Sequence, residues 1–289
     1  QAFLFTGTRG VGKTTCARIL AKVINCENIT EDIEPCNKCE SCVSFNNNQS
    51  LNIHELDAAS NNTVEDIRSL IDKVRFPPQG GKYSVYIIDE VHMLSQAAFN
   101  TFLKTLEEPP AYTKFILATT EKHKIIPTIL SRCQIFDFNR ITVNDIKKHL
   151  IYIAGQENIE AEEEALYIIA QKTDGALRDA LSMFDRIVSF CGKHITYKEV
   201  IENLRILDYD YYFRFVDCFK REDLSCALLM FDEILKYGFE GQNVIIGLGE
   251  HFRNLLVVKD IKTFSLLEVS EDMFNRYKNS LTLDISYLI

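Results

Sequence analysis

The sequence predicts an α/β protein in which a parallel, doubly wound sheet is followed by all-helical units. Between Ala2 and Phe138, five short apolar segments alternate with helical patterns. This order is typical of parallel strands joined by crossover helices. From Ile141 onward, the sequence shows only amphipathic helical patterns. A chain of 289 residues is long enough for two or three such domains.

Composition excludes some classes of protein. The net charge is −9, from 32 basic and 41 acidic residues, which excludes a broadly basic DNA-coating protein but not a local basic track. No apolar run approaches the roughly 18 residues of a membrane span, and no leader-like segment opens the chain, so we expect a cytoplasmic protein with no membrane partner. Because Gln1 lies just before the first strand, we expect a trimmed chain.

A glycine-rich motif follows the first strand, Ala2–Phe5. Gly7–Thr14 reads GTRGVGKT, which fits G-x-x-x-x-G-K-[ST], and a helical pattern follows at 16–24. A strand that turns through glycines into a helix directs backbone N–H groups and a helix dipole at one point, where phosphates bind. Lys13 would reach the β and γ phosphates and Thr14 would hold Mg²⁺. The residues expected to bind nucleotide here are Gly7, Thr8, Arg9, Gly10, Val11, Gly12, Lys13, Thr14 and Thr15.

Four of the nine cysteines are clustered after this helix. Their spacing is Cys26-x9-Cys36-x2-Cys39-x2-Cys42, in a polar run. Four thiolates at such spacing can close a tetrahedral zinc site, which leaves no open position for catalysis. We therefore favour structural zinc over free thiols in a loop.

The other cysteines are scattered, and the odd total without a secretory signal argues for reduced thiols. We expect these five to be small buried apolar residues. They are Cys16, Cys133, Cys191, Cys218 and Cys226.

Two further strands end in polar residues. After the strand at 51–56 and a helix that begins at the Thr63–Asp66 capping box, the apolar run 83–88 leads into Asp89 and Glu90. Downstream of a phosphate loop, Asp89 can complete the Mg²⁺ shell and Glu90 can polarise a water. Without that context, acids at a strand end are mostly solvated.

A helix that begins at Ser95 presents Phe99 and Phe102 to a core and ends at Pro109. The next strand, 114–118, leads into Thr119 and Thr120. Thr120 could contact a γ-phosphate or the attacking water, or be an ordinary polar strand end. A short helix near Pro127 precedes Ser131-Arg132-Cys133, and the last strand is 134–138.

The helical part begins with capping boxes at Thr142–Asp145 and Thr196–Glu199. Arg178 lies near a helix N-terminus, off the apolar stripe, where the dipole disfavours a cation; an outside anionic partner and a solvated arginine are equally good interpretations. Further on, two apolar stripes favour internal core over partner surface. They are Leu224, Leu228, Phe231 and Leu235, then Val244, Leu248, Phe252 and Leu255. The chain stops in helical-looking sequence, so we treat this last unit as partial.

Together these residues resemble the gamma/tau ATPase family of bacterial DNA polymerase III clamp loaders, which are AAA+ proteins. The resemblance runs through FTGTRGVGKTT, the four cysteines, LDAAS, YIIDEVHMLS, FNTFLKTLEEPP, FILATTE, ILSRCQIF and GALRDALS. It implies an AAA+ P-loop NTPase domain at 1–140 with a zinc module at 26–42, a helical lid domain at 141–206 and a partial helical collar domain at 207–289.

The same resemblance implies roles for individual residues. Lys13 and Thr14 belong to the nucleotide loop, Asp89 is the metal ligand and Glu90 the catalytic base. Thr120 is the first sensor, Arg132 an arginine finger that acts in trans on a neighbour's ATP, and Arg178 a second sensor that reaches the γ-phosphate. The implied cofactors are ATP/ADP, Mg²⁺ and structural Zn²⁺.

The function that the resemblance implies is ATP-driven opening of a sliding clamp and its loading onto primed DNA, within a ring of other clamp-loader subunits in the bacterial cytoplasm. One alternative is a non-hydrolysing scaffold similar to the delta-prime subunit, which typically lacks a working phosphate loop. Another is an AAA+ helicase or remodeller, for which pore-loop aromatic residues and translocation are expected.

Overall fold

The computed structural model describes residues 1–79, 81–204, 206–267, 269 and 271–280. The chain divides into two compact units. The first contains Gln1–Ile141 together with Gly175–Asp179, and the second contains Thr142–Asp174 and the chain from Ala180 onward. The predicted end of the third domain, 281–289, lies outside the described residues.

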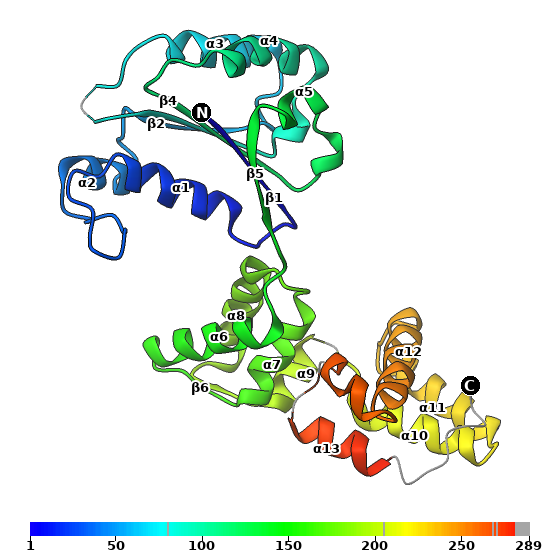
Figure 1. The fold of residues 1–289 in the computed structure, drawn as a ribbon. Helices are drawn as coiled ribbons and strands as arrows, with labels where there is room; N and C mark the ends of the chain where they lie inside the picture. Colours follow the sequence, from blue (N-terminus) through cyan, green and yellow to red (C-terminus); the bar gives the residue numbers. More distant parts are fainter. Residues whose placement is uncertain (80, 205, 268, 270, 281–289) are drawn as a thin grey trace. The chain divides into compact units, whose positions relative to one another are not determined.

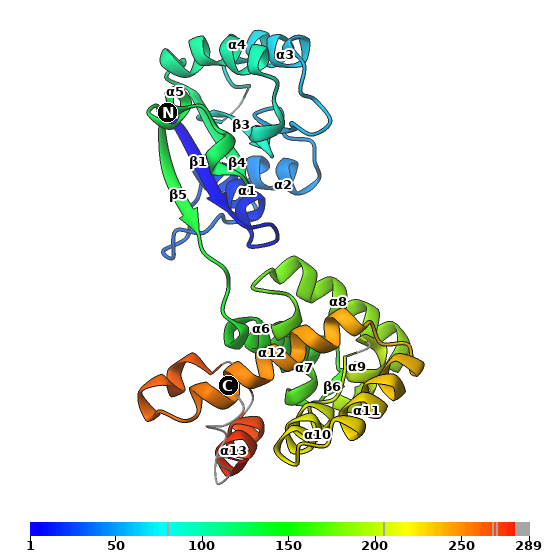
Figure 2. The same cartoon turned by 90° about the vertical axis from the view of Figure 1, so that its right-hand side faces the viewer.

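A five-stranded parallel sheet forms the centre of the first unit. The strands are β1 (Ala2–Gly7), β2 (Ile53–Asp57), β3 (Ser84–Asp89), β4 (Thr113–Thr119) and β5 (Cys133–Phe138). Their order is β2-β3-β4-β1-β5, and each neighbouring pair is parallel. In Figure 2, β1 lies between β4 and β5. Because all strands run the same way, the residues that follow β1, β3 and β4 meet at one edge of the sheet.

Helices cover both faces of this sheet (Figure 1). One face packs against α1 (Lys13–Ile24) and α2 (Glu40–Asn46), and the other against α3 (Val64–Val74), α4 (Gln96–Glu107) and α5 (Pro127–Leu130). Alternate residues of β3 serve the two cores: Tyr86 and Ile88 pack with the second group of helices, and Ile87 packs with α1. A strand covered on both faces reads as a continuous apolar run, which is why periodicity in the sequence located it.

Side-chain caps begin several of the helices where the sequence predicts them. Thr63 and Asp66 form the complete capping box of α3. Ser95 accepts a hydrogen bond from the backbone N–H of Ala98 at the start of α4, and Thr142 accepts from Asp145. Each cap of this kind stabilises a helix by about 1 kcal/mol.

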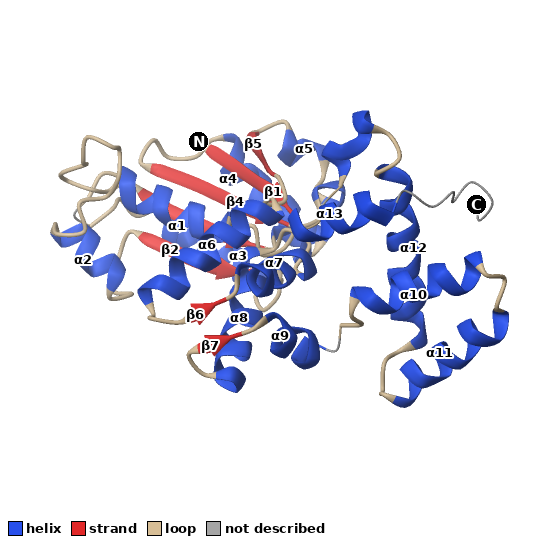
Figure 3. Ribbon diagram, turned by 90° about the horizontal axis from the view of Figure 1, so that it is seen from below, coloured by secondary structure: helices blue, strands red, loops and turns tan. Residues whose placement is uncertain are grey.

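The second unit is mainly helical. Its helices are α6 (Val143–Gln156), α7 (Glu163–Lys172), α8 (Leu177–Cys191, whose first residues belong to the first unit), α9 (Tyr197–Leu204), α10 (Tyr209–Lys220), α11 (Leu224–Lys236), α12 (Gly241–Val257) and α13 (Glu271–Ser280). Two two-residue strands, β6 (Glu160–Ala161) and β7 (His194–Ile195), pair in parallel (Figure 3), which the helical pattern did not predict. Three short 3-10 helices complete the described elements: η1 (Val91–Met93), η2 (Lys122–Lys124) and η3 (Ile261–Leu266).

The prediction that the apolar stripe of α11 forms internal core is wrong for three of its four residues, and only Phe231 packs, partly buried, against the core. Leu224, Leu228 and Leu235 are 67%, 61% and 41% exposed. The buried face of the helix consists instead of Ala227, Met230 and Ile234, which pack in one core with α10 and α12. This helix is apolar on two neighbouring faces, so helical spacing alone could not select the one that packs.

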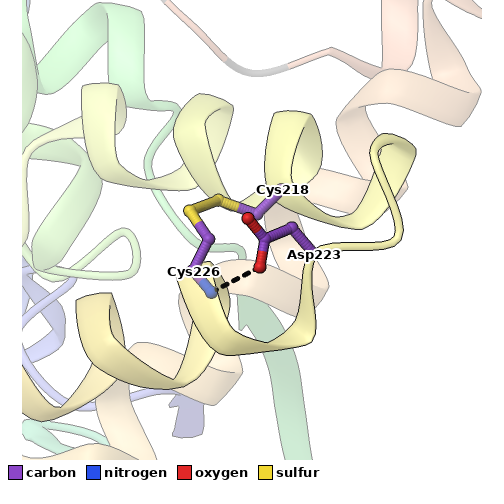
Figure 4. Close-up of a disulfide and its surroundings, with 3 residues drawn as sticks. All are labelled: Cys218, Asp223 and Cys226. Atoms are coloured by element: carbon purple, nitrogen blue, oxygen red, sulfur yellow. Dashed lines mark hydrogen bonds between the residues drawn. A yellow bond between two sulfur atoms is a disulfide. The ribbon is translucent and has the colours of Figure 1, made fainter.

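Two of the scattered cysteines are not free thiols. Cys218, in the last turn of α10, forms a disulfide with Cys226, in the first turn of α11 (Figure 4). Their Cα atoms are 6.0 Å apart, and the side chain of Asp223 accepts a hydrogen bond of 2.9 Å from the backbone of Cys226. A short turn between two helices places positions eight residues apart opposite each other, which a count of cysteines cannot show.

The buried interpretation of the other scattered cysteines also needs correction. Cys16 is exposed, whereas Cys133 and Cys191 are partly buried. Burial raises the pKa of the Cys133 thiol to about 11. Ala17 and Ala21 lie on the face of α1 that packs against the sheet. Cys16 lies on another face, which turns away from the sheet.

Candidate functional site

The carboxyl edge of the large sheet collects the polar residues that the sequence singles out. Gly7–Thr14 runs from the last residue of β1 through the following loop into α1. Asp89 and Glu90 stand at the end of β3, and Thr119 and Thr120 at the end of β4. The register places Thr6 of β1 beside Thr119 of β4, and β3 pairs with the other side of β4. Three loops therefore converge on one region.

The loop after β1 needs glycine. Gly7 has φ +153°, and a Cβ there would lie 2.3 Å from the carbonyl oxygen of Phe138. Gly12 caps α1 with a left-handed backbone, φ 96°, and provides no side chain to occupy the first amides of the helix. Those N–H groups and the positive end of the α1 dipole are what an anion requires.

Lys13 and Thr14 lie at the start of α1. Lys13 is buried, and its Nζ donates 2.9 Å hydrogen bonds to the carbonyl oxygens of Gly7 and Thr8. Burial lowers the pKa of Lys13, while Glu90 and Asp89 act in the opposite direction. The hydroxyl of Thr14 donates a 2.7 Å hydrogen bond to Oδ2 of Asp89. A hydroxyl and a carboxylate this close form an oxygen donor set that suits Mg²⁺.

Glu90 is held by the neighbouring strand end. Its own backbone is left-handed, φ 46° and ψ 44°, and its N–H donates to Oδ1 of Asp89 at 2.9 Å. Its Oε2 accepts hydrogen bonds from Thr120, at 3.0 Å from the hydroxyl and 3.3 Å from the backbone N–H. A non-glycine residue in this conformation costs on the order of 1–3 kcal/mol, and such residues cluster at functional sites.

Sequence reasoning missed His92, which follows Glu90 in η1. Its side chain is only 6% exposed. Nδ1 lies 3.3 Å from Oε2 of Glu90 and 3.1 Å from the hydroxyl of Thr119, and Nε2 lies 3.4 Å from Oε1 of Glu121. The only signal in the sequence was a histidine two residues after the acidic pair.

Arg178 is placed beside the phosphate loop by its backbone. It belongs to the segment Gly175–Asp179, which is part of the first unit, and its N–H donates to the carbonyl oxygen of Gly10 at 3.2 Å. A Cβ at Gly10 would lie 3.0 Å from the Cβ of Ala176 and 3.4 Å from that of Arg178. Glycine at position 10 is therefore required for this close approach.

Arg132 is not brought to this edge. It precedes β5, whose first residue pairs with Ala2, the first residue of β1. The loop that follows β1 is six residues further along the sheet, about 20 Å at 3.3 Å per residue. The guanidinium contacts Oε1 of Glu107 at 2.7 Å and the carbonyl oxygen of Thr128 at 2.7 Å.

The four clustered cysteines do converge. The sulfur atoms of Cys26, Cys36, Cys39 and Cys42 all lie within 4.8 Å of one another. Sγ of Cys36 accepts backbone hydrogen bonds from Lys38 and Cys39, which lower the pKa of this thiol to about 6, whereas burial raises that of Cys42 to about 12. Four sulfur donors, of which Cys26 and Cys36 accept hydrogen bonds from backbone N–H groups, fit a tetrahedral zinc ion.

No helix within the described part of the chain is long and apolar enough to cross a membrane.

A parallel sheet in this order, with a phosphate loop after β1 and an acidic pair after β3, defines an AAA+ P-loop nucleotide-binding fold. Solved structures agree at the level of the fold. RuvB of Thermotoga maritima, as its R170A variant, superimposes with a TM-score of 0.51 over 75% of this chain and 67% of the RuvB chain, at 18% identity.

Sequence comparisons define the family. Residues 1–142 match the model of the DNA polymerase III delta subunit, and residues 145–193 match the ATPase lid domain of DNA polymerase III clamp loader subunits. The gamma subunit of Buchnera aphidicola subsp. Acyrthosiphon pisum (strain APS) is 39% identical over 97% of this chain and 76% of its own length. The chain therefore belongs to the gamma/tau family of DNA polymerase III clamp loader subunits, as the resemblance implied.

Other relatives are considerably longer than this chain. The tau subunit of Bacillus subtilis (strain 168) is 45% identical over 90% of this chain, and the tau subunit of Escherichia coli (strain K12) is 41% identical over 85%. The matched region spans 46% and 38% of those two proteins.

Proposed function

We propose that this chain is an ATP-hydrolysing motor subunit of the DNA polymerase III clamp loader, which opens a sliding clamp and places it on primed DNA in the bacterial cytoplasm. One observation supports hydrolysis more than any other. The carboxylate of Glu90, held by Thr120, stands next to the Thr14–Asp89 pair and the phosphate loop. A base, a metal-binding pair and an anion site in one place are the parts that phosphoryl transfer to water requires.

In the proposed reaction the backbone N–H groups of Gly10–Thr15 bind the phosphates of ATP, and Lys13 balances their charge. Thr14 and Asp89 would hold Mg²⁺, which would supply further charge neutralisation when bound. Glu90 accepts a proton from a water molecule while the oxygen of that water bonds to the γ-phosphorus. The bond between the γ-phosphorus and the bridging oxygen breaks, which leaves ADP and inorganic phosphate.

Further residues would adjust this site. Thr120 orients Glu90 or the γ-phosphate as the first sensor. Arg178, whose backbone already contacts Gly10, would reach the γ-phosphate as the second sensor. Arg132, remote from the loop of its own chain, would act on ATP bound by a neighbouring subunit. The four cysteines would hold a structural zinc ion.

We further propose the domain division 1–140, 141–206 and 207–289, in which the second domain is the lid and the third a collar that contacts other subunits. The partners of the chain are then the other subunits of the ring, the sliding clamp and primer–template DNA. A remodeller or helicase would instead translocate along its substrate without a clamp.

The test is a Glu90→Gln variant of the full-length protein, assayed alone and assembled with its partner subunits, clamp and primed DNA. We expect ATP binding to be unchanged and hydrolysis to fall by about 10²–10⁴-fold, the usual contribution of a general base. Glu65→Gln, at an exposed position of α3, is the matched control.

A Glu90→Gln complex that still loads clamps at the normal rate would favour the non-hydrolysing scaffold. Failure of the assembled protein to bind a clamp, together with movement along DNA, would favour the remodeller.

A further inference from the structure

The ring of His92 joins the two strand ends that form the candidate catalytic site. It belongs to η1, directly after β3, and the backbone of this turn is closed by a 2.8 Å hydrogen bond from Met93 N–H to the carbonyl oxygen of Glu90. On the other side, Thr119 ends β4 and Glu121 precedes η2. The ring is buried between them, with one nitrogen toward Glu90 and Thr119 and the other toward Glu121.

Contacts to Glu90 are concentrated on one of its two carboxylate oxygens. Oε2 accepts hydrogen bonds from the Thr120 hydroxyl and the Thr120 backbone N–H, and Nδ1 of His92 lies 3.3 Å from it as an ion-pair contact. Oε1 has no hydrogen-bond partner among the residues that the structure describes. A carboxylate held at one oxygen keeps the other in a defined direction, which is the condition for a general base to face its water.

The ring itself is held from behind. Nε2 lies 3.4 Å from Oε1 of Glu121. A hydrogen bond from Lys124 lowers the pKa of Glu121, so this group is an anion at neutral pH. The ring donates to Glu90 and to Glu121 together only when both of its nitrogens carry protons. The backbone N–H of Glu121 also donates to the hydroxyl of Thr119 at 3.0 Å. Glu121, which faces Nε2, and Thr119, which faces Nδ1, therefore belong to one turn.

We propose that His92 is a positioning residue for hydrolysis: through Nδ1 it holds Oε2 of Glu90 together with Thr120, so that Oε1 is directed to the attacking water. This inference rests on the proposed function, in which Glu90 is the general base. Thr119 competes for Nδ1, which lies 3.1 Å from its hydroxyl, so the test must separate the two partners.

The variants are made in the full-length protein, and ATP hydrolysis is measured in the assembled complex with clamp and primed DNA. We expect His92→Ala to lower kcat by about 10- to 100-fold, the range in which a misplaced catalytic group acts, while KM and nucleotide Kd change less than about twofold. His92→Asn retains a donor near the position of Nδ1 and should recover most of kcat. His92→Gln, whose amide extends toward the position of Nε2, should not.

Two controls bracket this result. His123 is exposed and lies 3.5 Å from the same Glu121, so His123→Asn should leave kcat unchanged. Thr119→Val removes the other partner of Nδ1 and should lower kcat less than His92→Ala does. A loss of kcat with Thr119→Val equal to that of His92→Ala would assign Nδ1 to Thr119 and overturn the proposal.

The remaining outcomes are also decisive. If His92→Ala retains full kcat while Glu90→Gln is inactive, His92 does not position the base although the proposed function stands. An increase in hydrolysis on removing His92 would mean that the contact restrains Glu90, which also overturns the proposal. If Glu90→Gln remains active, the proposed function itself fails. Should His92→Ala not fold, the comparison of Asn with Gln decides.

Discussion

At the scale of single residues, the second unit contains a buried histidine with an unusual environment. His251, in α12, is 1% exposed, and its Nδ1 lies 2.6 Å from the hydroxyl of Tyr277 in α13. Among the described residues, Nε2 has no hydrogen-bond partner. Burial, aided by the charge of Arg276, lowers the pKa of His251 to about 4. The folded protein therefore requires the neutral ring.

This shift predicts a dependence of stability on pH. The pKa of His251 in the folded protein is below its value in the unfolded chain, about 6.5. As the pH decreases, the unfolded state therefore binds the proton first, and the free energy of unfolding falls. The loss occurs between about pH 6.5 and 4 and amounts to about 3 kcal/mol at most. His251→Asn, which can still pair with Tyr277, should remove this part of the dependence of the free energy of unfolding on pH. The free energy is measured by urea unfolding followed by circular dichroism, and its slope against pH is compared.

His194→Asn is the matched control, because that ring is exposed in the same unit. Carboxylates titrate in the wild-type and variant proteins alike, so the comparison is the difference between their slopes. Equal slopes for wild type and His251→Asn would contradict the assignment.

At the scale of elements, the segment between α1 and α2 depends on its cysteines. It contains no regular helix or strand from Cys26 to Lys38, and the buried sulfur cluster is the core on which it is built. The side chain of Lys22 in α1 contacts Asn37 and, at 2.6 Å, Asn46, which ties the segment to the first helix. A polar insertion with so little apolar surface gains much of its stability from a metal.

We therefore predict one zinc ion per chain, measured by elemental analysis of the purified full-length protein. Cys39→Ser should lower the zinc content well below one and decrease the thermal midpoint by several degrees, since each kcal/mol of stability lost corresponds to about 2–4 °C in a domain of this size. Cys16→Ser, outside the cluster, should change neither quantity. A metal-free chain that is fully folded would contradict this interpretation.

At the scale of the whole molecule, we propose that Arg132 acts on the site of a neighbouring chain rather than on its own. The structure brings together Lys13, Thr14, Asp89, Glu90 and Thr120, but Arg132 lies at the opposite end of the strands, paired with Glu107. An arginine supplied by a neighbour makes hydrolysis depend on assembly, because charge that develops on the γ-phosphate is then stabilised only in the ring.

Arg132→Ala should leave ATP binding by the isolated chain intact and lower turnover of the assembled complex by orders of magnitude, about 10³-fold or more where such arginines have been removed. Binding is measured by titration with a fluorescent ATP analogue and turnover by phosphate release. Arg68→Ala, at an exposed position of α3, is the control. Loss of ATP binding in the isolated Arg132→Ala chain would show that the action in trans is wrongly assigned.

Many features of the fold were predictable because they depend on short sequence patterns and on the order of the strands. The strands, the capping boxes and the glycine-rich loop follow from short-range patterns, and the comparisons confirm the fold class and the family. The roles of the site residues and the division into three domains stay predictions. Compactness groups the chain into two units rather than three.

Motifs in a set order were enough to predict the five-stranded architecture, the convergence of Gly7–Thr14 with Asp89 and Thr120, and the family. The remaining features follow from packing between distant segments. The place of His92 depends on Thr119 of β4 and on Glu121 after it, and the Cys218–Cys226 pair depends on the turn between two helices. The leucines of α11 are exposed because the other apolar face of this helix packs against α10 and α12. In each case the position or burial of a residue depends on packing against segments distant in the sequence, which a local pattern does not show.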